Sequence, residues 1–311
     1  MILQRAAITI VLGGTTVVGI AAPARGQSLA ERAHAVLAEA LANEKAFVKV
    51  HAAEALIALG EQDEPRRVFR AERPAADEIR PYRIGVWRVL AASSATPAER
   101  AEWIARVEAV VLDPATMDRL HAVETLGKLG HAPGGRVRAA VEAMAKGSEA
   151  EAVFPHWVLH LAGDPAALPA IVAALDSADP AARLRAAYVL RWLNINDATT
   201  RAAMARTAGR EPSASIGYAI VLGAAVTLDA DPARTPGWVA ALEQIIANGS
   251  TGARYDACQI LMRRYTTADL ARLAPLLDHP DGDARIGAAW AILHVSRAKS
   301  PVPAAQPARS R

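Results

Sequence analysis

The residues with the clearest potential for chemistry occur in a phrase that the chain repeats. HAAEALIALG, which begins at His51, returns as HAVETLGKLG, which begins at His121. Each copy places a glutamate three residues after its histidine, at Glu54 and Glu124. Residues three apart lie on one face of a helix, so each copy would present an imidazole beside a carboxylate. Such a pair can bind a metal, exchange a proton or form ion pairs.

Aligning the chain on the leucine that ends the first half of this phrase extends the pattern. The aligned leucines are Leu56, Leu90, Leu126, Leu161, Leu190, Leu222, Leu261 and Leu293. Their spacing runs from 29 residues (Leu161 to Leu190) to 39 residues (Leu222 to Leu261). The alignment predicts a binding stripe on one face of successive helices, made of His51, Glu54, Arg83, Trp87, Arg88, Arg119, His121, Glu124, His156, Trp157, His160 and Tyr188.

The elements that would position this stripe are helices. A period in the middle thirties is typical of stacked helix pairs. Between the leucine phrases lie further amphipathic segments, such as ERAEWIARVEAVVL and GWVAALEQIIA, with apolar residues at three and four spacing. No stretch alternates apolar and polar residues as a half-buried strand does. The sequence therefore predicts an all-α fold of helix, turn, helix units.

Turn residues agree with this division into units. Gly60, Gly130 and Gly163 follow their helices, where a left-handed cap is common. Asp-Pro pairs begin at Asp113, Asp164, Asp179 and Asp231. Aspartate suits the N-cap of a helix and proline suits its first residue. Each pair is therefore predicted to end one helix and start the next.

The phrases VKVHAAEALIALG and LRAAYVLRWL, together with the Asp-Pro turns, resemble HEAT repeats of the short kind that is also called phycobilisome-lyase-like. The resemblance runs from about Ser28 to Ala298. It implies a right-handed α-solenoid of about eight helix pairs, curved into an arc whose concave wall is formed by the second helix of each pair. Residues 62–81 depart from the pattern, because prolines and charges replace a regular first helix there.

Both ends of the chain differ from the middle. Residues 1–26 contain Arg5, an uncharged apolar run and small residues at the expected cleavage site, which is the pattern of a secretory signal peptide. We therefore expect an exported protein of bacterial type, periplasmic or secreted, without a membrane span after cleavage. Residues 27–298 are predicted to form the HEAT-like solenoid, and residues 299–311 a disordered, proline-rich tail.

Composition narrows the function. The chain is 52% hydrophobic with a formal net charge of +3, which favours a folded protein and argues against a nucleic-acid partner. No phosphate-binding glycine loop or nucleophile elbow is found, so no catalytic residue and no cofactor are predicted. The single cysteine, Cys258, excludes a disulfide within the chain.

Three interpretations of the stripe remain open. Its charges can form ladders that tie neighbouring repeats together, or they can recognise a partner on the concave face. We expect a non-catalytic scaffold that binds a protein or peptide along its N-terminal concave face. The alternative is a metal-dependent enzyme, with iron or zinc, on the same scaffold. Its candidate ligands are His51, Glu54, His121, Glu124, His156 and His160.

The metal alternative has a precedent among HEAT-repeat proteins. Deoxyhypusine hydroxylase holds two irons between His-Glu pairs, whereas the pairs in this chain are spaced His-x-x-Glu. The repeat between the two pairs carries Gly85 and Arg88 at the equivalent positions. Helices two repeats apart would be separated by roughly 20 Å, too far to share one metal ion.

Overall fold

The computed structural model of the protein describes residues 27–212, 216–228 and 233–298. Every regular element in these ranges is a helix, which confirms the all-α prediction for them. The predicted signal peptide (1–26), the predicted tail (299–311) and the Asp-Pro pair at 231–232 lie outside the described residues. None of the described helices is long and apolar enough to cross a membrane.

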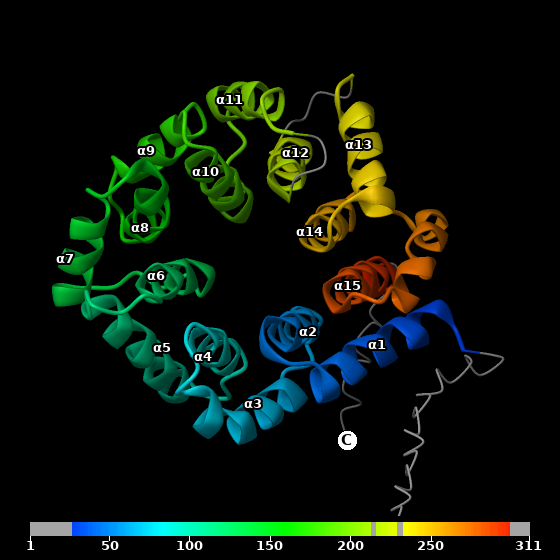
Figure 1. The fold of residues 1–311 in the computed structure, drawn as a ribbon, viewed down its shortest axis with the longest axis horizontal. Helices are drawn as coiled ribbons and strands as arrows, with labels where there is room; N and C mark the ends of the chain where they lie inside the picture. The colour runs from blue at the N-terminus through cyan, green and yellow to red at the C-terminus, as the bar shows by residue number, and fades with distance from the viewer. Residues whose placement is uncertain (1–26, 213–215, 229–232, 299–311) are drawn as a thin grey trace, which may run out of the picture.

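The helices are arranged in two layers around a centre (Figure 1). The outer layer consists of α1 (Leu29–Asn43), α3 (Asp63–Ala76), α5 (Pro97–Leu112), α7 (Gly135–Met144), α9 (Ala167–Ala174), α11 (Ala198–Ala208) and α13 (Thr235–Asn248). The inner layer consists of α2 (Ala46–Ala58), α4 (Tyr82–Ala92), α6 (Arg119–Lys128), α8 (Glu149–Leu161), α10 (Pro180–Leu193), α12 (Ile216–Leu228), α14 (Thr251–Leu261) and α15 (Gly282–Ala298). Two short 3-10 helices, η1 (Thr267–Arg272) and η2 (Ala274–Asp278), take the outer place beside α15.

Each outer helix packs against the inner helix that follows it, and neighbouring inner helices pack against one another. The eight aligned leucines all lie on inner helices. Seven of them are buried and Leu161 is partly buried. The repeated phrase is thus the part of each unit that packs into the common core. Burial of each leucine side chain there contributes roughly 1.5–3 kcal/mol to stability.

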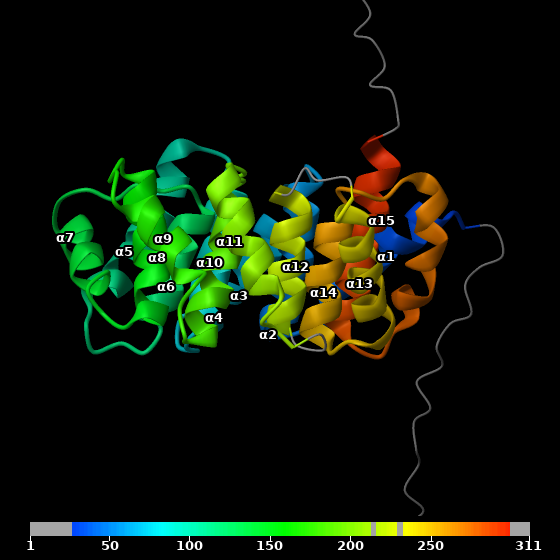
Figure 2. The same cartoon turned by 90° about the horizontal axis from the view of Figure 1, so that it is seen from above.

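The first and last helices of the described chain pack together. Both α1 and α2 contact α15, so the helices close into a ring instead of the open arc expected from the sequence (Figure 1). In the view from above, the ring is wider than it is thick (Figure 2). Ion pairs at this junction join Arg32 to Asp278 (3.0 Å), Arg285 to Glu44 (2.6 Å) and Arg297 to Glu61.

Close helix contact at the junction depends on a glycine. A Cβ atom at Gly282, the first residue of α15, would lie 2.6 Å from Cγ1 of Val48 on α2. Two carbon atoms cannot approach so closely without displacement. The absence of a side chain at this position therefore lets α15 approach the first unit and complete the ring.

The turn predictions are confirmed in part. Gly60, Gly130 and Gly163 have φ of +86°, +63° and +82°, the left-handed conformation that glycine adopts most easily. Asp179 caps α10, and its side chain accepts a hydrogen bond from the Ala181 amide at 2.9 Å. These residues end and start helices as expected.

Two other Asp-Pro pairs do not start helices. The side chains of Asp113 and Asp164 accept hydrogen bonds from backbone amides two residues later, at 3.0 and 2.9 Å. Each forms a turn, and α6 and α9 begin only at Arg119 and Ala167. The prediction was wrong here because an aspartate can stabilise a turn of its own as readily as a helix start.

Residues 62–81 are more regular than their prolines suggested. Helix α3 covers most of this segment. Pro65 lies in its first turn, where the missing amide hydrogen would have no helical partner. Pro74 lies close to the end of the helix, so little helix follows it. The expected break is therefore confined to the helix terminus.

Candidate ligand-binding site at the ring centre

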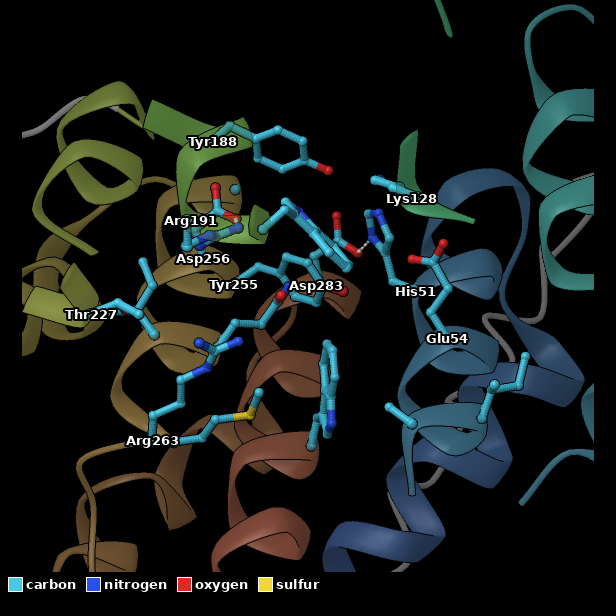
Figure 3. Close-up of a pocket in the computed structure, with 18 of the residues that line it drawn as sticks. His51, Glu54, Lys128, Tyr188, Arg191, Thr227, Tyr255, Asp256, Arg263 and Asp283 are labelled. Atoms are coloured by element: carbon cyan, nitrogen blue, oxygen red, sulfur yellow. Dashed lines mark hydrogen bonds and ion pairs between the residues drawn. The ribbon is translucent and has the colours of Figure 1, made fainter. Parts of the chain in front are cut away.

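A cavity of about 600 Å³ lies between the inner helices. Its lining includes side chains from every inner helix except α8 (Figure 3). A volume of this size falls in the range of ligand-binding sites in proteins, roughly 300–1,000 Å³. The inward faces of the inner helices thus line one central cavity that is open to solvent.

Two positions of the repeat supply much of this lining. Residues two before the aligned leucine that line the cavity are Glu54, Arg88, Tyr188 and Gln259. Residues two after it are Ala58, Ala92, Lys128, Trp192 and Arg263. These positions are four residues apart, so they share one helix face, and in the ring that face points inward.

A buried guanidinium connects three inner helices at one side of the cavity. Arg88 is 4% exposed, and its Nε donates to Oε1 of Glu54 at 2.5 Å. Its Nη1 lies 3.2 Å from both Oγ1 of Thr125 and Nε2 of His121. Because a guanidinium only donates hydrogen bonds, Nε2 of His121 must accept, and the ring is the neutral tautomer protonated on Nδ1.

The protonation of His121 follows from the same surroundings. Burial, reinforced by the positive charge of Arg88, lowers the pKa of His121 to about 4. A neutral imidazole avoids placing a second buried positive charge beside the guanidinium. His121 is therefore a hydrogen-bond acceptor for Arg88 at neutral pH.

Glu124 belongs to the same network. Its Oε1 accepts from the hydroxyl of Tyr188 at 3.0 Å and lies 3.0 Å from Nζ of Lys128. Burial opposes the ionised carboxylate, but the positive charges of Lys128 and Arg88 outweigh it and lower the pKa of Glu124 to about 2. Burial raises the pKa of Tyr188 to about 12. These groups hold fixed charges and a neutral phenol against the cavity.

The opposite wall comes from the last two inner helices. Nδ1 of His51 lies 2.9 Å from Oδ1 of Asp283 on α15. The His51 ring stacks on Tyr255 of α14, with 4.7 Å between ring centres and 23° between ring planes. Burial raises the pKa of Tyr255, so its phenol stays neutral. The closed ring thus fixes the imidazole from two sides (Figure 3).

Arg191 differs from the other charged side chains described above, because its guanidinium is not fully hydrogen-bonded. Its side chain is 9% exposed, and its Nη1 is buried without a hydrogen-bond partner among the described residues. Nη2 lies 3.9 Å from Oδ1 of Asp256, which is too long for a hydrogen bond. Burial raises the pKa of Asp256, and burial together with the charge of Arg191 lowers the pKa of Arg263. Arg191 therefore lies beside a carboxylate without a hydrogen bond to it.

The structure brings together half of the predicted stripe. His51, Glu54, Arg88 and Tyr188 line the cavity, and His121 and Glu124 bond to them. The stripe was expected in the N-terminal half alone, but the ring opposes it with residues from the C-terminal half.

Three predicted stripe residues hold helices together instead of lining the cavity. Nε of Arg83 donates to Oδ2 of Asp118 at 2.7 Å, which joins neighbouring units. Nε of Arg119 donates to the carbonyl oxygen of Val111 at 2.7 Å, and Nε1 of Trp87 donates to Oδ1 of Asp77 at 2.7 Å. These side chains point toward adjacent helices, so their predicted place on the binding surface is corrected.

The predicted residues of α8 also lie away from the cavity. Trp157 is 2% exposed and packs so closely on α6 that a Cβ at Gly127 would lie 2.5 Å from its ring. Nδ1 of His156 is buried without a hydrogen-bond partner among the described residues, and burial lowers the pKa of this imidazole. His160 is partly buried at the end of the helix and does not line the cavity. Trp157 thus packs between α8 and α6 instead of facing the cavity.

Several lining residues were missed from the sequence, namely Lys128, Arg191, Tyr255, Asp256, Arg263 and Asp283. Two of these could have been found by reading two residues past each aligned leucine, which gives Lys128 and Arg263. Asp256 occupies the position of His51 in a later repeat, five before its leucine. No local signal marks Asp283, because its role depends on closure of the ring.

The candidate metal ligands do not form a metal site. No group of three or more His, Cys, Asp or Glu side chains suited to a metal ion occurs in the described part of the chain. Arg88 lies between the two pairs and bonds to both Glu54 and His121. The lone pair that His121 would offer to a metal therefore faces a guanidinium.

Comparison with known proteins supplies no further assignment. No protein-family model matches the sequence, and no curated protein matches it. The cavity and its side chains are therefore the features that indicate a function.

Proposed function

We propose that this protein is a non-catalytic binding module whose central cavity takes a compact ligand. The observation that carries this proposal is that charged and apolar side chains from both halves of the ring face one cavity. Their fixed hydrogen bonds preorganise the wall, which lowers the cost of ordering the site on binding. The ligand is either a free small molecule or the end of a partner peptide.

Ring closure changes the kind of partner that fits. In an open arc, an extended peptide could lie along the whole concave wall. In the closed ring, the wall surrounds a cavity of about 600 Å³, which suits a compact group better than a long segment. The proposed protein or peptide partner would therefore present a chain end to this site.

The proposal also includes the type of repeat and the location of the protein. The order of outer and inner helices, with one aligned leucine on each inner helix, supports an assignment to HEAT-like units. The predicted signal peptide supports export to the periplasm or beyond the cell. An exported binding protein with a preformed ligand site is consistent with both features. No observation on the described side chains favours the metal-dependent alternative.

The cavity can be tested by blocking it. Ala92 is an exposed residue at the end of α4 that lines the cavity. The parent protein should bind the neutral apolar dye N-phenyl-1-naphthylamine saturably, in a ratio of one to one. The Ala92→Trp variant should bind it at least tenfold more weakly, because an indole would occupy the space of the ligand.

A matched variant separates blocking from a general effect of tryptophan. Ala202 is exposed on the outer helix α11 and does not line the cavity. Ala202→Trp should bind the dye like the parent, and circular dichroism should show that all three proteins are folded. Equal dye affinity in the parent and Ala92→Trp would refute the central cavity as the binding site.

A further inference from the structure

The hydrogen-bonding state of Arg191 points to the chemistry of the ligand. Arg191 lies on α10 and lines the cavity. Its side chain is only 9% exposed, and its Nη1 has no hydrogen-bond partner among the described residues. A buried donor without an acceptor costs roughly 1–3 kcal/mol, and more when it is charged. If the Arg191 side chain turns toward the cavity that it lines, an acceptor atom of a ligand can remove this cost.

A second cation faces the same part of the cavity. Arg263 follows α14 and lines the cavity near Arg191 (Figure 3). No side-chain hydrogen bond or ion pair of Arg263 is found among the described residues, whereas Arg88 is paired with Glu54 and Lys128 with Glu124. Arg191 and Arg263 are thus the two arginines of the cavity that have no hydrogen bond to a carboxylate among the described residues.

Large apolar side chains also line the cavity. Trp192 and Ile216 line the cavity and are 47% and 44% exposed. Ile260, Met262 and Trp290 also line it. A ligand that satisfies both features has an anionic group attached to an apolar body.

We infer that the central cavity binds an apolar carboxylate, with its carboxylate against Arg191 and Arg263. This inference rests on the proposed binding function and names the class of ligand. A guanidinium matches a carboxylate with two parallel hydrogen bonds. Glu54, Asp256 and Asp283 line the same cavity, so a singly charged carboxylate meets less repulsion there than a doubly charged phosphate.

The carboxylate can come from a free acid or from the C-terminus of a peptide, and titration calorimetry distinguishes these sources. One pair of probes is octanoate and octanol, and the other is a leucine-ending tetrapeptide with a free or an amidated C-terminus. In the pair that corresponds to the natural source, the carboxylate should bind at least tenfold more tightly than its neutral partner.

Variants of the two arginines test the inferred contact. Arg191→Met should reduce the preference for the carboxylate to less than threefold while binding of the neutral probe is retained, because methionine preserves the apolar stem. Arg263→Met should also reduce the preference for the carboxylate. It provides the test of the contact if Arg191→Met does not fold. Arg206→Met is the matched control, because Arg206 is an exposed residue of α11 that pairs with Asp176 at 2.8 Å.

The outcomes separate the two proposals. If the neutral dye binds the cavity but neither carboxylate exceeds its neutral partner, the inferred ligand class is refuted and the binding function stands. If a carboxylate preference survives in both Arg191→Met and Arg263→Met, the assigned contact is wrong. If Ala92→Trp leaves binding of dye and carboxylates unchanged, both proposals fail, since the cavity is then not the site.

Discussion

His51 and Asp283 are 232 residues apart in the chain, and 2.9 Å separates Nδ1 of the imidazole from Oδ1 of the carboxylate. The contact joins α2 to α15 at the point where the ring closes. Both side chains are about three-quarters buried, at 24% and 22% exposure. Closure of the ring therefore positions a cavity residue as well as joining the two ends of the fold.

The His51 and Asp283 contact should contribute measurably to stability. Asp283→Ala is expected to lower the free energy of unfolding by about 1–2 kcal/mol, because the partly buried imidazole loses its hydrogen-bond partner. A double-mutant cycle with His51→Ala, followed by urea unfolding, should give a coupling energy of at least about 0.5 kcal/mol. Asp278→Ala is the control, because this exposed junction carboxylate should cost about 1 kcal/mol or less. A coupling energy of zero would show that the two residues act independently.

Arg88 should be far more important for stability than its place on the predicted binding stripe suggests. The sequence places Glu54, Arg88 and Glu124 on a solvent-facing wall, but Arg88 is buried and bonds to Glu54. Arg88→Met is expected to destabilise the fold by about 3–5 kcal/mol, because it leaves a poorly solvated carboxylate unpaired.

Chemical denaturation of Arg88→Met and Arg206→Met measures this difference. Arg206 is 56% exposed, so Arg206→Met should cost about 1 kcal/mol or less. Adding Glu54→Gln to Arg88→Met should recover part of the lost stability, since the unpaired charge is removed. A loss of less than about 1 kcal/mol in Arg88→Met would contradict the buried network.

The imidazole of His121 should make stability depend on pH. In the unfolded chain its pKa is about 6.5, whereas in the fold it is about 4. As the pH falls below about 6.5, the unfolded state takes up the proton first, so this residue lowers stability progressively until about pH 4 and has no such effect above pH 6.5. Between pH 7 and pH 5 the expected loss is about 2 kcal/mol.

Urea unfolding at these two pH values compares the parent with His121→Gln, whose amide oxygen can still accept from Arg88 without titrating. The variant should lose about 2 kcal/mol less than the parent on acidification. Nuclear magnetic resonance should locate the titration of His121 near pH 4. A titration near pH 6.5 would mean that the imidazole is not held as an acceptor by the network.

Gly127 should be intolerant of even a methyl group. Its Cβ would lie 2.5 Å from the buried ring of Trp157, which cannot move without displacing its own neighbours. Gly127→Ala is therefore expected to destabilise the fold by about 1–3 kcal/mol despite the higher helix propensity of alanine. Thermal unfolding should show the reverse for Gly237→Ala in α13, where an added Cβ would meet no side chain and about 0.5–1 kcal/mol is gained. Equal effects would show that Trp157 does not pack on Gly127.

The helical class and the repeating unit of the fold follow from the amino-acid sequence alone. Local periodicity places an apolar face on each helix, and that face requires a neighbouring helix whatever the wider arrangement is. The aligned leucines and the turn glycines were therefore found correctly. The inward position of Glu54, Arg88 and Tyr188 could also be read from the repeat, because equivalent residues of a repeat face the same way.

Which of these residues share a site depends on how the helices pack in three dimensions. Rotation between units accumulates from small differences in packing at every helix contact, and no local pattern fixes its sum. That sum brings α15 against α1 and α2, so Asp283 meets His51 and the arc becomes a ring around a cavity. It also turns Trp157 into the core and leaves Arg191 buried without a hydrogen-bond partner for Nη1 among the described residues, because these outcomes depend on which neighbouring helix fills the space.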